Sequence, residues 1–305
     1  MLTPEQARAF KEDGAVVLRG FVEPPVVDAW RKQAWDAIRA AQGDAGISED
    51  DPGSWPAGYI GNVEGAMQPK PPLGSLPQFE KLVAWLAGDT LSGGGHMLKA
   101  IFPAKDGDEP NEQSLGRGPT AAVRAESTIA PSGHVIAGPS GDHMDGSGHH
   151  RLACTLLLTD CEHDGGSFMF WKGGHKRIHQ FWRAHPQFIG PPRPGREEFH
   201  DTPAFQQRGW TAIHDADDTC HEPGTQFIGK AGDCVLWHGW CPHSQSVNLK
   251  SVPRLALVAR WNDRVPLLDE NGQKTFHVPD SLDRLFEHWS PELDASGGDT
   301  GTARM

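Results

Sequence analysis

The amino-acid sequence predicts a mainly β protein, built as a sandwich or barrel behind a mostly helical N-terminal part. Glycine and proline are abundant, at 36 and 25 of 305 residues, which favours many turns and long loops. Apolar residues at sustained helical spacing are scarce and lie mainly in the first 90 residues. Beyond about residue 95, short apolar runs follow one another without intervening helices. Such a succession favours antiparallel sheets over a parallel α/β fold.

The N-terminal part opens with a helix signal. Thr3 can cap the helix, Pro4 takes its first position, and Gln6 completes a capping box. Further along, Pro24 starts a second helix in which apolar residues recur at helical spacing. The expected elements are a strand over 14–18, a helix over 24–39, a long loop over 42–75 and a helix over about 77–87.

The β-rich part is expected to complete one domain with these helices. Its candidate strands lie between Gly, Pro and Asp turns, at 96–102, 122–129, 133–138, 151–159, 167–171, 226–229, 233–237 and 254–261. A long insertion rich in Pro, Gly and charged residues is expected to be a lid. The prediction is a single domain at 1–294, followed by a disordered tail at 295–305. The domain would consist of a helical part (1–90), a β-rich core (95–265) with the lid as an insertion (177–225), and a C-terminal segment (266–294). A short helix is expected near 280–289.

Charge and cysteine content narrow the class of partner and the compartment. The chain has 28 basic and 40 acidic residues, a net charge of −12, which argues against binding nucleic acid. There is no apolar run long enough for a membrane span and no recognisable secretory signal. Five cysteines without a CxxC pair suit a reducing compartment, so we expect a cytoplasmic protein. The last residues, Ala303 to Met305, weakly resemble a peroxisomal address.

A histidine and an aspartate two residues apart stand near the middle of the chain. His143 and Asp145 lie in the run GDHMDG, and on a strand end their side chains would leave the same face. One imidazole and one carboxylate form two-thirds of the ligand set of non-haem Fe(II) oxygenases. By itself the pair is weak, because about one such pair is expected by chance in a chain of this composition. A polar turn with a solvated aspartate remains the alternative.

A second block, KAGDCVLWHGWCPHSQSVN at 230–248, contains two histidines, His238 and His243. Arg254 follows and opens an apolar strand that ends at Trp261. An arginine in a core strand needs an anionic partner, because an unpaired buried charge is costly. A carboxylate would provide one, since guanidinium can hold it through two parallel hydrogen bonds.

Together these blocks resemble the phytanoyl-CoA dioxygenase (PhyH-like) family of 2-oxoglutarate oxygenases over most of the chain. Residues 2–30 resemble the family's opening helix, strand and helix, and His143-Met144-Asp145 matches its HxD motif. Residues 156–176 resemble its strand and "NG-x-L…PGSHK" hairpin, although this chain has KGGHK there. Residues 230–254 match its distal block: a first histidine, the ligand histidine, asparagine five residues later and arginine eleven residues later.

The resemblance implies a double-stranded β-helix, a cupin-like jelly roll, with the N-terminal helices packed on its outside. It implies that His143, Asp145 and His243, and not His238, bind Fe(II). It also implies 2-oxoglutarate as co-substrate, with O₂, and Arg254 as the partner of its distal carboxylate.

Three further residues are candidate co-substrate contacts. Thr155 stands where the family often has such a contact, but a threonine packed in the core explains it equally well. Gln245 takes the position where the family often has serine, and Ser244 lies beside it.

The expected activity is Fe(II)- and 2-oxoglutarate-dependent hydroxylation of an unactivated C–H bond in a small metabolite, releasing succinate and CO₂. The alternatives are α-hydroxylation of an acyl-CoA, as in the phytanoyl-CoA type, and a metal-binding cupin-like protein without oxygenase activity. A zinc hydrolase would leave Arg254 unexplained, and the presence of Asp145 disfavours a halogenase. The substrate and the oligomeric state remain open.

The other notable side chains are expected at the surface, in the lid or in the core. His150 is placed at the pocket mouth or in solvent, and His175 and His179 at the surface or in the lid. A basic run that includes Lys172 and Lys176 is interpreted as a solvated lid or as a site for an anionic group. Arg183 and Arg193 are the leading candidates for substrate selection in that lid. The tryptophans at 171, 237 and 240 are interpreted as core.

Overall fold

The computed structural model describes residues 1–43, 46–56, 59–64, 73–104, 150–184, 224–246 and 248–265, together with 267–268, 270, 272 and 274–275. The larger of its sheets has strand order β1-β7-β4-β9-β3-β2, and each neighbouring pair is antiparallel. These strands span Ala15–Leu18 (β1), Tyr59–Glu64 (β2), Leu91–Ile101 (β3), His150–Leu157 (β4), Cys234–His238 (β7) and Arg254–Asp263 (β9).

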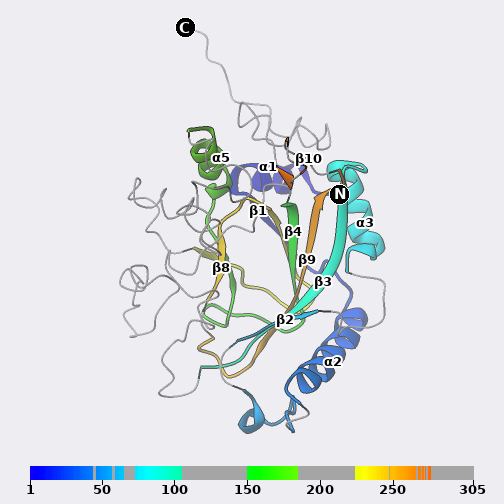
Figure 1. The fold of residues 1–305 in the computed structure, drawn as a ribbon. Helices are drawn as coiled ribbons and strands as arrows, with labels where there is room; N and C mark the ends of the chain where they lie inside the picture. Colours follow the sequence, from blue (N-terminus) through cyan, green and yellow to red (C-terminus); the bar gives the residue numbers. More distant parts are fainter. Residues whose placement is uncertain are drawn as a thin grey trace.

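The smaller sheet has the order β6-β5-β8, again antiparallel, with strands at Thr225–Gln226, Phe168–Phe170 and His243–Gln245. A separate hairpin pairs β10 (Leu267–Leu268) with β11 (Lys274–Thr275). The helices are α1 (Pro4–Asp13), α2 (Pro24–Ala41), α3 (Pro77–Ala87) and α5 (Gly174–Ala184), with short 3₁₀ turns η1 (Pro52–Ser54) and η2 (Leu73–Ser75). In Figure 1, α2 and α3 lie along one side of the large sheet, and β8 lies on the other side.

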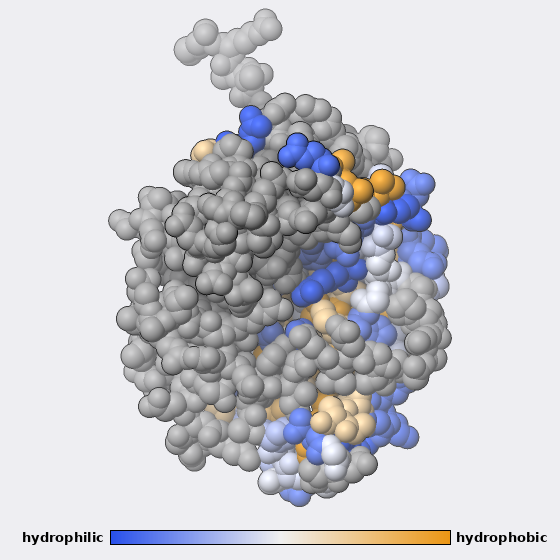
Figure 2. Space-filling view, viewed as in Figure 1, coloured by the Kyte–Doolittle hydropathy of each residue, from blue (hydrophilic) through white to orange (hydrophobic). Residues whose placement is uncertain are grey.

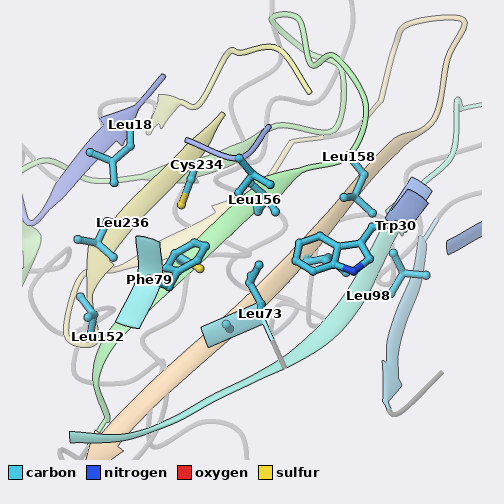
Figure 3. Packing of buried hydrophobic residues seen from close by; sticks show 14 of the residues in the cluster. Leu18, Trp30, Leu73, Phe79, Leu98, Leu152, Leu156, Leu158, Cys234 and Leu236 are labelled. Carbon is cyan, nitrogen blue, oxygen red and sulfur yellow. The ribbon is translucent and has the colours of Figure 1, made fainter. Parts of the chain in front are cut away.

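Alternate residues of the central strands pack on opposite faces of the large sheet. Leu152 and Leu156 of β4 lie in a cluster with residues of the helices, such as Trp30 of α2 (Figure 3). Ala153, between them on the same strand, lies in a second cluster with Phe168 of the small sheet. The large sheet is therefore covered by helices on its outer face and by the small sheet on its inner face. This arrangement is a jelly roll, and it confirms the predicted mainly β fold.

The N-terminal elements form as the sequence indicates. Thr3 Oγ1 accepts a hydrogen bond from Gln6 N at 3.2 Å, and Gln6 Oε1 accepts one from Thr3 N at 2.9 Å, so the predicted capping box is present. Gly14 ends α1 with φ of 78°, a conformation that favours glycine. The chain then enters β1, whose far end is held to the sheet by Asp233: its carboxylate accepts hydrogen bonds from Gly20 N and from Arg19.

Two segments predicted to be irregular contain regular elements. The predicted loop at 42–75 contains β2, which pairs with β3 at the edge of the large sheet, as well as η1 and η2. The predicted lid at 177–225 begins inside a helix, because α5 runs from Gly174 to Ala184. The candidate strands at 122–129 and 133–138, the helix near 280–289 and the tail at 295–305 lie outside the described residues.

Exposed hydrophobic residues occupy only small areas of one face of the molecule. In the view of Figure 2 its exposed residues are mostly hydrophilic, and hydrophobic colour is limited to small areas. No helix in the described ranges is both long and apolar enough to cross a membrane.

Candidate active site

The predicted site residues divide into two groups. His143 and Asp145 lie outside the described residues, so the structure does not place them. His243, Gln245, Arg254 and Thr155 are described together with their side chains, and of Ser244 the backbone is described, which pairs with Met169. Within the described ranges, no group of three or more His, Cys, Asp or Glu side chains could hold a metal ion.

His243 opens β8 and lies in the layer between the two sheets. Its ring packs against Trp237 of the large sheet, with 4.2 Å between centroids, and against Phe168 of β5, at 5.4 Å. The side chain is buried, with 6 % of the residue exposed. Nδ1 lies 3.0 Å from the carbonyl oxygen of Cys241. When Nδ1 donates its proton to that oxygen, Nε2 carries the lone pair, which is the arrangement of a metal-binding imidazole.

His238 lies on the opposite face of the large sheet. On β7 it shares its face with Leu236, which belongs to the cluster under the helices. Its ring packs edge-on against Trp240 at 5.6 Å and lies 5.6 Å from the ring of His175 on α5. Burial holds the pKa of His238 well below its ordinary value, assisted by the nearby His175 and Arg151. This histidine is therefore a neutral core residue that does not face the inner layer.

Arg254 opens β9 and projects into the same inner layer as His243. It shares its face with Ala256 and Val258, and 2 % of the residue is exposed. Nε donates a hydrogen bond to Gly166 O at 2.7 Å, and Nη2 donates one to Gln245 Oε1 at 2.8 Å. Both of these acceptors are neutral, so neither cancels the charge of the guanidinium.

Gln245 follows His243 by two residues on β8, so both side chains leave the same face of the small sheet. Two residues along a strand are about 7 Å apart. The inner layer therefore has an imidazole and, about 7 Å further along the strand backbone, a half-buried amide that is hydrogen-bonded to a buried guanidinium. A five-carbon dicarboxylate can bridge that separation.

The floor beneath these groups is made of small side chains. Thr155 of β4 pairs with Val235 and Val258 on the neighbouring strands, and Ala153 and Ala256 lie in the adjacent positions of the same face. Thr155 is 1 % exposed, and its Oγ1 has no hydrogen-bond partner among the described residues. An unsatisfied buried hydroxyl is costly, so a ligand oxygen at this place would stabilise it.

The loops around Arg254 are tightly built. Gly166 has φ of +74°, and a Cβ there would lie 2.9 Å from the side chain of Ile101, so this position requires glycine. Asn248 donates hydrogen bonds to Ile101 O at 3.0 Å and Val252 O at 2.8 Å, which fixes the turn that leads to Arg254. Burial raises the pKa of the nearby Cys161 thiol, against the opposing effect of Arg254.

Some residues lie where the sequence did not place them. His150 was expected at the pocket mouth but is buried, with its ring 5.7 Å from that of Trp237. His175 and His179 were expected at the surface or in the lid, and both are buried on α5, because this segment is a helix packed on the core. In the basic run, Lys172 pairs with Asp13 at 2.7 Å and Lys176 pairs with Glu12, so both bind α1.

Sequence reasoning missed Trp237 and Phe168 as neighbours of His243. Trp237 was correctly expected to be buried, but burial alone does not give the face. The alternation along the strand CVLWH at 234–238 could have shown on which face of the sheet Trp237 lies, since Leu236 and Trp237 must point to opposite sides.

Comparison with a family model gives one match. Residues 136–256 match the family described as phytanoyl-CoA dioxygenase (PhyH), and this segment contains every site residue predicted above. No curated protein sequence gives a significant match to the chain.

Several solved structures are similar in fold. EvdMO1 is 16 % identical with a TM-score of 0.51, and the match covers 86 % of this chain and 50 % of that one. The epimerase SnoN, in complex with Fe³⁺, alpha ketoglutarate and nogalamycin RO, is 18 % identical with a TM-score of 0.48, covering 85 % and 82 %. HygX from Streptomyces hygroscopicus, with nickel and 2-oxoglutarate bound, is 17 % identical with a TM-score of 0.45, covering 87 % and 88 %. The likeness to EvdMO1 supports the fold described above.

Proposed function

We propose, from the match of residues 136–256 to the phytanoyl-CoA dioxygenase (PhyH) family, that this chain is an Fe(II)- and 2-oxoglutarate-dependent dioxygenase. Its reaction would be the hydroxylation of an unactivated C–H bond in a small organic metabolite. The observation that carries the proposal is the inner face of the jelly roll. There His243 and the Gln245–Arg254 pair project into one buried layer above a floor of small side chains.

The donor chemistry of the described residues fits the proposed iron. His243 is buried with its Nδ1 next to a backbone carbonyl, which leaves Nε2 as the ligand atom. His143 and Asp145 would complete a 2-His-1-carboxylate set, the ligand set typical of non-haem Fe(II) oxygenases. With iron and 2-oxoglutarate bound, the site would supply the reduction of O₂, coupled to release of succinate and CO₂ and to oxidation of the substrate.

The remaining residues would bind and orient the co-substrate. Arg254 would hold the distal carboxylate of 2-oxoglutarate, with the amide of Gln245 fixing the guanidinium in place. The hydroxyl of Thr155 would donate to a co-substrate oxygen from the floor, and Ser244 remains a further candidate contact. Holding both ends of the co-substrate fixes its orientation before the reaction begins.

The substrate itself is proposed only as a class. A small metabolite is favoured over an acyl-CoA, because the net charge of −12 disfavours a large polyanion. Residues 185–223 of the predicted lid, with Arg193, lie outside the described residues, so its role in selection stays a prediction.

Metal binding by alanine variants tests the proposal directly. We expect His143→Ala, Asp145→Ala and His243→Ala each to lose tight Fe(II) binding and 2-oxoglutarate-dependent succinate release. His238→Ala is the matched control, since it removes a buried histidine from the outer face of the large sheet, away from the inner layer, and it should keep iron. A variant set in which His238→Ala loses iron while His243→Ala keeps it would refute the ligand assignment.

Succinate release across a panel of substrates would identify the reaction. The panel would contain two groups of compounds, acyl-CoA thioesters and small uncharged or cationic metabolites. Labelling with ¹⁸O₂ would show whether the oxygen atom in the product comes from O₂. Stimulation by the acyl-CoA group alone would replace our substrate class with the acyl-CoA alternative. Tight iron binding without succinate release in either group would indicate a metal-binding protein without oxygenase activity.

A further inference from the structure

Trp237 makes the shortest measured ring contact of His243. The centroids of the two rings are 4.2 Å apart, with 44° between their planes. Phe168 touches both rings, at 5.4 Å from His243 and 5.4 Å from Trp237. The three rings therefore form a triangle in which each packs against the other two. All three residues are buried.

This triangle joins the two sheets. His243 and Phe168 belong to β8 and β5 of the small sheet, whereas Trp237 belongs to β7 of the large one. The neighbours of Trp237 in the large sheet are both alanines, Ala15 on β1 and Ala153 on β4. Small neighbours leave the indole free to extend across the layer to the opposite sheet. Its position therefore fixes where the ring of His243 can lie.

We propose that Trp237 is a positioning residue for His243, acting through the packing of its ring and not through its indole N–H. The inference rests on the proposed function, in which His243 binds the metal. Cys241 O lies 3.0 Å from Nδ1, on one edge of the imidazole. The ring of Trp237 packs against the imidazole and is itself supported by Phe168, so these contacts together limit rotation of the ring and aim Nε2 at one point.

The chain contains a matched control. Trp240 is fully buried, as Trp237 is, and packs edge-on against a histidine, His238, at 5.6 Å. It lies in the cluster under the helices, on the outer face of the large sheet. Loss of this indole removes a similar amount of buried apolar surface, but it does so away from the inner layer. An effect seen with variants of both tryptophans is therefore attributed to the loss of stability alone.

The test measures Co(II) binding, as an oxygen-stable probe for Fe(II), to the metal-free full chain. Outer partners of metal ligands typically change metal affinity by about 10- to 100-fold, so Trp237→Leu should weaken Co(II) binding by that factor and shift its ligand-field absorption bands. Trp237→Phe keeps an aromatic ring without the N–H and should bind within a few-fold of the unaltered protein. Trp240→Leu should lower the melting temperature but keep the unaltered affinity and spectrum.

Different outcomes separate the two hypotheses. If His243→Ala binds Co(II) normally, the proposed function fails, and this inference fails with it. If His243→Ala loses Co(II) while Trp237→Leu keeps the unaltered affinity and spectrum, the positioning role alone is wrong. Equal losses of Co(II) affinity in Trp237→Phe and Trp237→Leu would assign the positioning role to the indole N–H and refute a role of ring packing. Phe168→Leu provides the same test on the third ring if Trp237→Leu does not fold.

Discussion

Arg254 is a buried charged side chain in the layer between the two sheets. Burying a guanidinium costs free energy unless hydrogen bonds and an opposite charge compensate for it. Gly166 O and Gln245 Oε1 supply hydrogen bonds but no charge. In the proposed function, the distal carboxylate of 2-oxoglutarate would lie beside this guanidinium and add an opposite charge.

Arg254→Ala should therefore raise the KM for 2-oxoglutarate strongly and leave metal affinity nearly unchanged. A hydrogen bond to a charged group contributes about 1.5–3 kcal/mol, which corresponds to roughly a 10- to 100-fold change or more. Steady-state kinetics in 2-oxoglutarate, together with Co(II) titration, would measure both quantities. Unchanged kinetics would show that Arg254 serves the fold alone.

Gln245→Glu provides a sharper test of the same pair. The substituted side chain has nearly the same shape but is anionic, so it would form an ion pair with Arg254. It would thereby compete with the co-substrate carboxylate for the guanidinium. We expect the KM for 2-oxoglutarate to rise at least about tenfold, the scale of one charged hydrogen bond, while thermal stability is kept or increased. A fall in stability with unchanged KM would contradict this account.

At the scale of single residues, the sequence predicted candidate ligand side chains but not the residues that surround them. Arg254 was predicted to meet a carboxylate because a cation in a core strand needs one. The choice of His243 over His238 as metal ligand came from the resemblance and stays a prediction; in the structure His243 faces the inner layer, whereas His238 lies on the outer face of the large sheet. The burial of His150 could not be foreseen, because it depends on Trp237, a residue far away in the chain.

Among the elements, α5 shows how a helix is fixed through a buried histidine. The ring of His175 contacts α1 through Nε2 and Lys11 O at 3.0 Å, and a Cβ at Gly14 would clash with it. Burial lowers the pKa of His175 to about 4, the hydrogen bond with Lys11 O opposes that shift, and the nearby Lys176, Glu12 and His179 add smaller effects of both signs.

Acid should therefore weaken the attachment of α5. In the unfolded chain a histidine has its ordinary pKa near 6.5. Between about pH 6.5 and pH 4 the unfolded state binds more protons, so stability is present at higher pH and is lost as the pH falls through this window. The loss attributable to His175 between pH 7.5 and pH 5 is about 2 kcal/mol.

Chemical denaturation at both pH values would measure this effect. His175→Gln should lose less stability on acidification than the unaltered protein. His163→Gln is the control, because its side chain is 62 % exposed, and it should follow the unaltered protein. The same loss in all three proteins would assign the pH dependence to other groups, among them His238.

For the whole molecule, the two faces of the large sheet have separate tasks. Leu156 and Thr155 are adjacent on β4, yet Leu156 packs under the helices and Thr155 lies on the inner floor. We expect Leu156→Ala to lower the free energy of unfolding by about 2–5 kcal/mol and leave the KM for 2-oxoglutarate unchanged. Thr155→Val keeps the shape and removes a buried hydroxyl, so it should leave stability equal or higher and raise that KM.

Denaturant titration and kinetics on both variants would measure this separation. If Thr155→Val leaves the KM unchanged, Thr155 is a packed core residue, which is the alternative that the sequence left open. If Leu156→Ala raises the KM as much as Thr155→Val does, the two faces are not independent.

The sequence predicted the architecture well where the signal is local. The capping box of α1, the helix at Pro77–Ala87 and the apolar runs of β4, β7 and β9 follow from residue type and spacing. Strand β2 was missed because its Gly-rich surroundings resemble a loop, and it becomes a strand only through pairing with β3. Helix α5 was missed because its polar and Gly-flanked sequence is a weak helix signal, and its packing on α1 stabilises it.

The first strand of the large sheet finds its partner very late in synthesis. Ala15 pairs with Trp237 and Leu18 with Cys234, so β1 has no place in the sheet until the ribosome has passed both sites. At typical rates of 5–20 residues per second, this segment waits roughly ten to forty seconds with its apolar AVVL run unpaired. Contacts between such distant positions also slow folding. A nascent chain halted before residue 234 would thus present this run to chaperones, whereas one halted after β9 would conceal it.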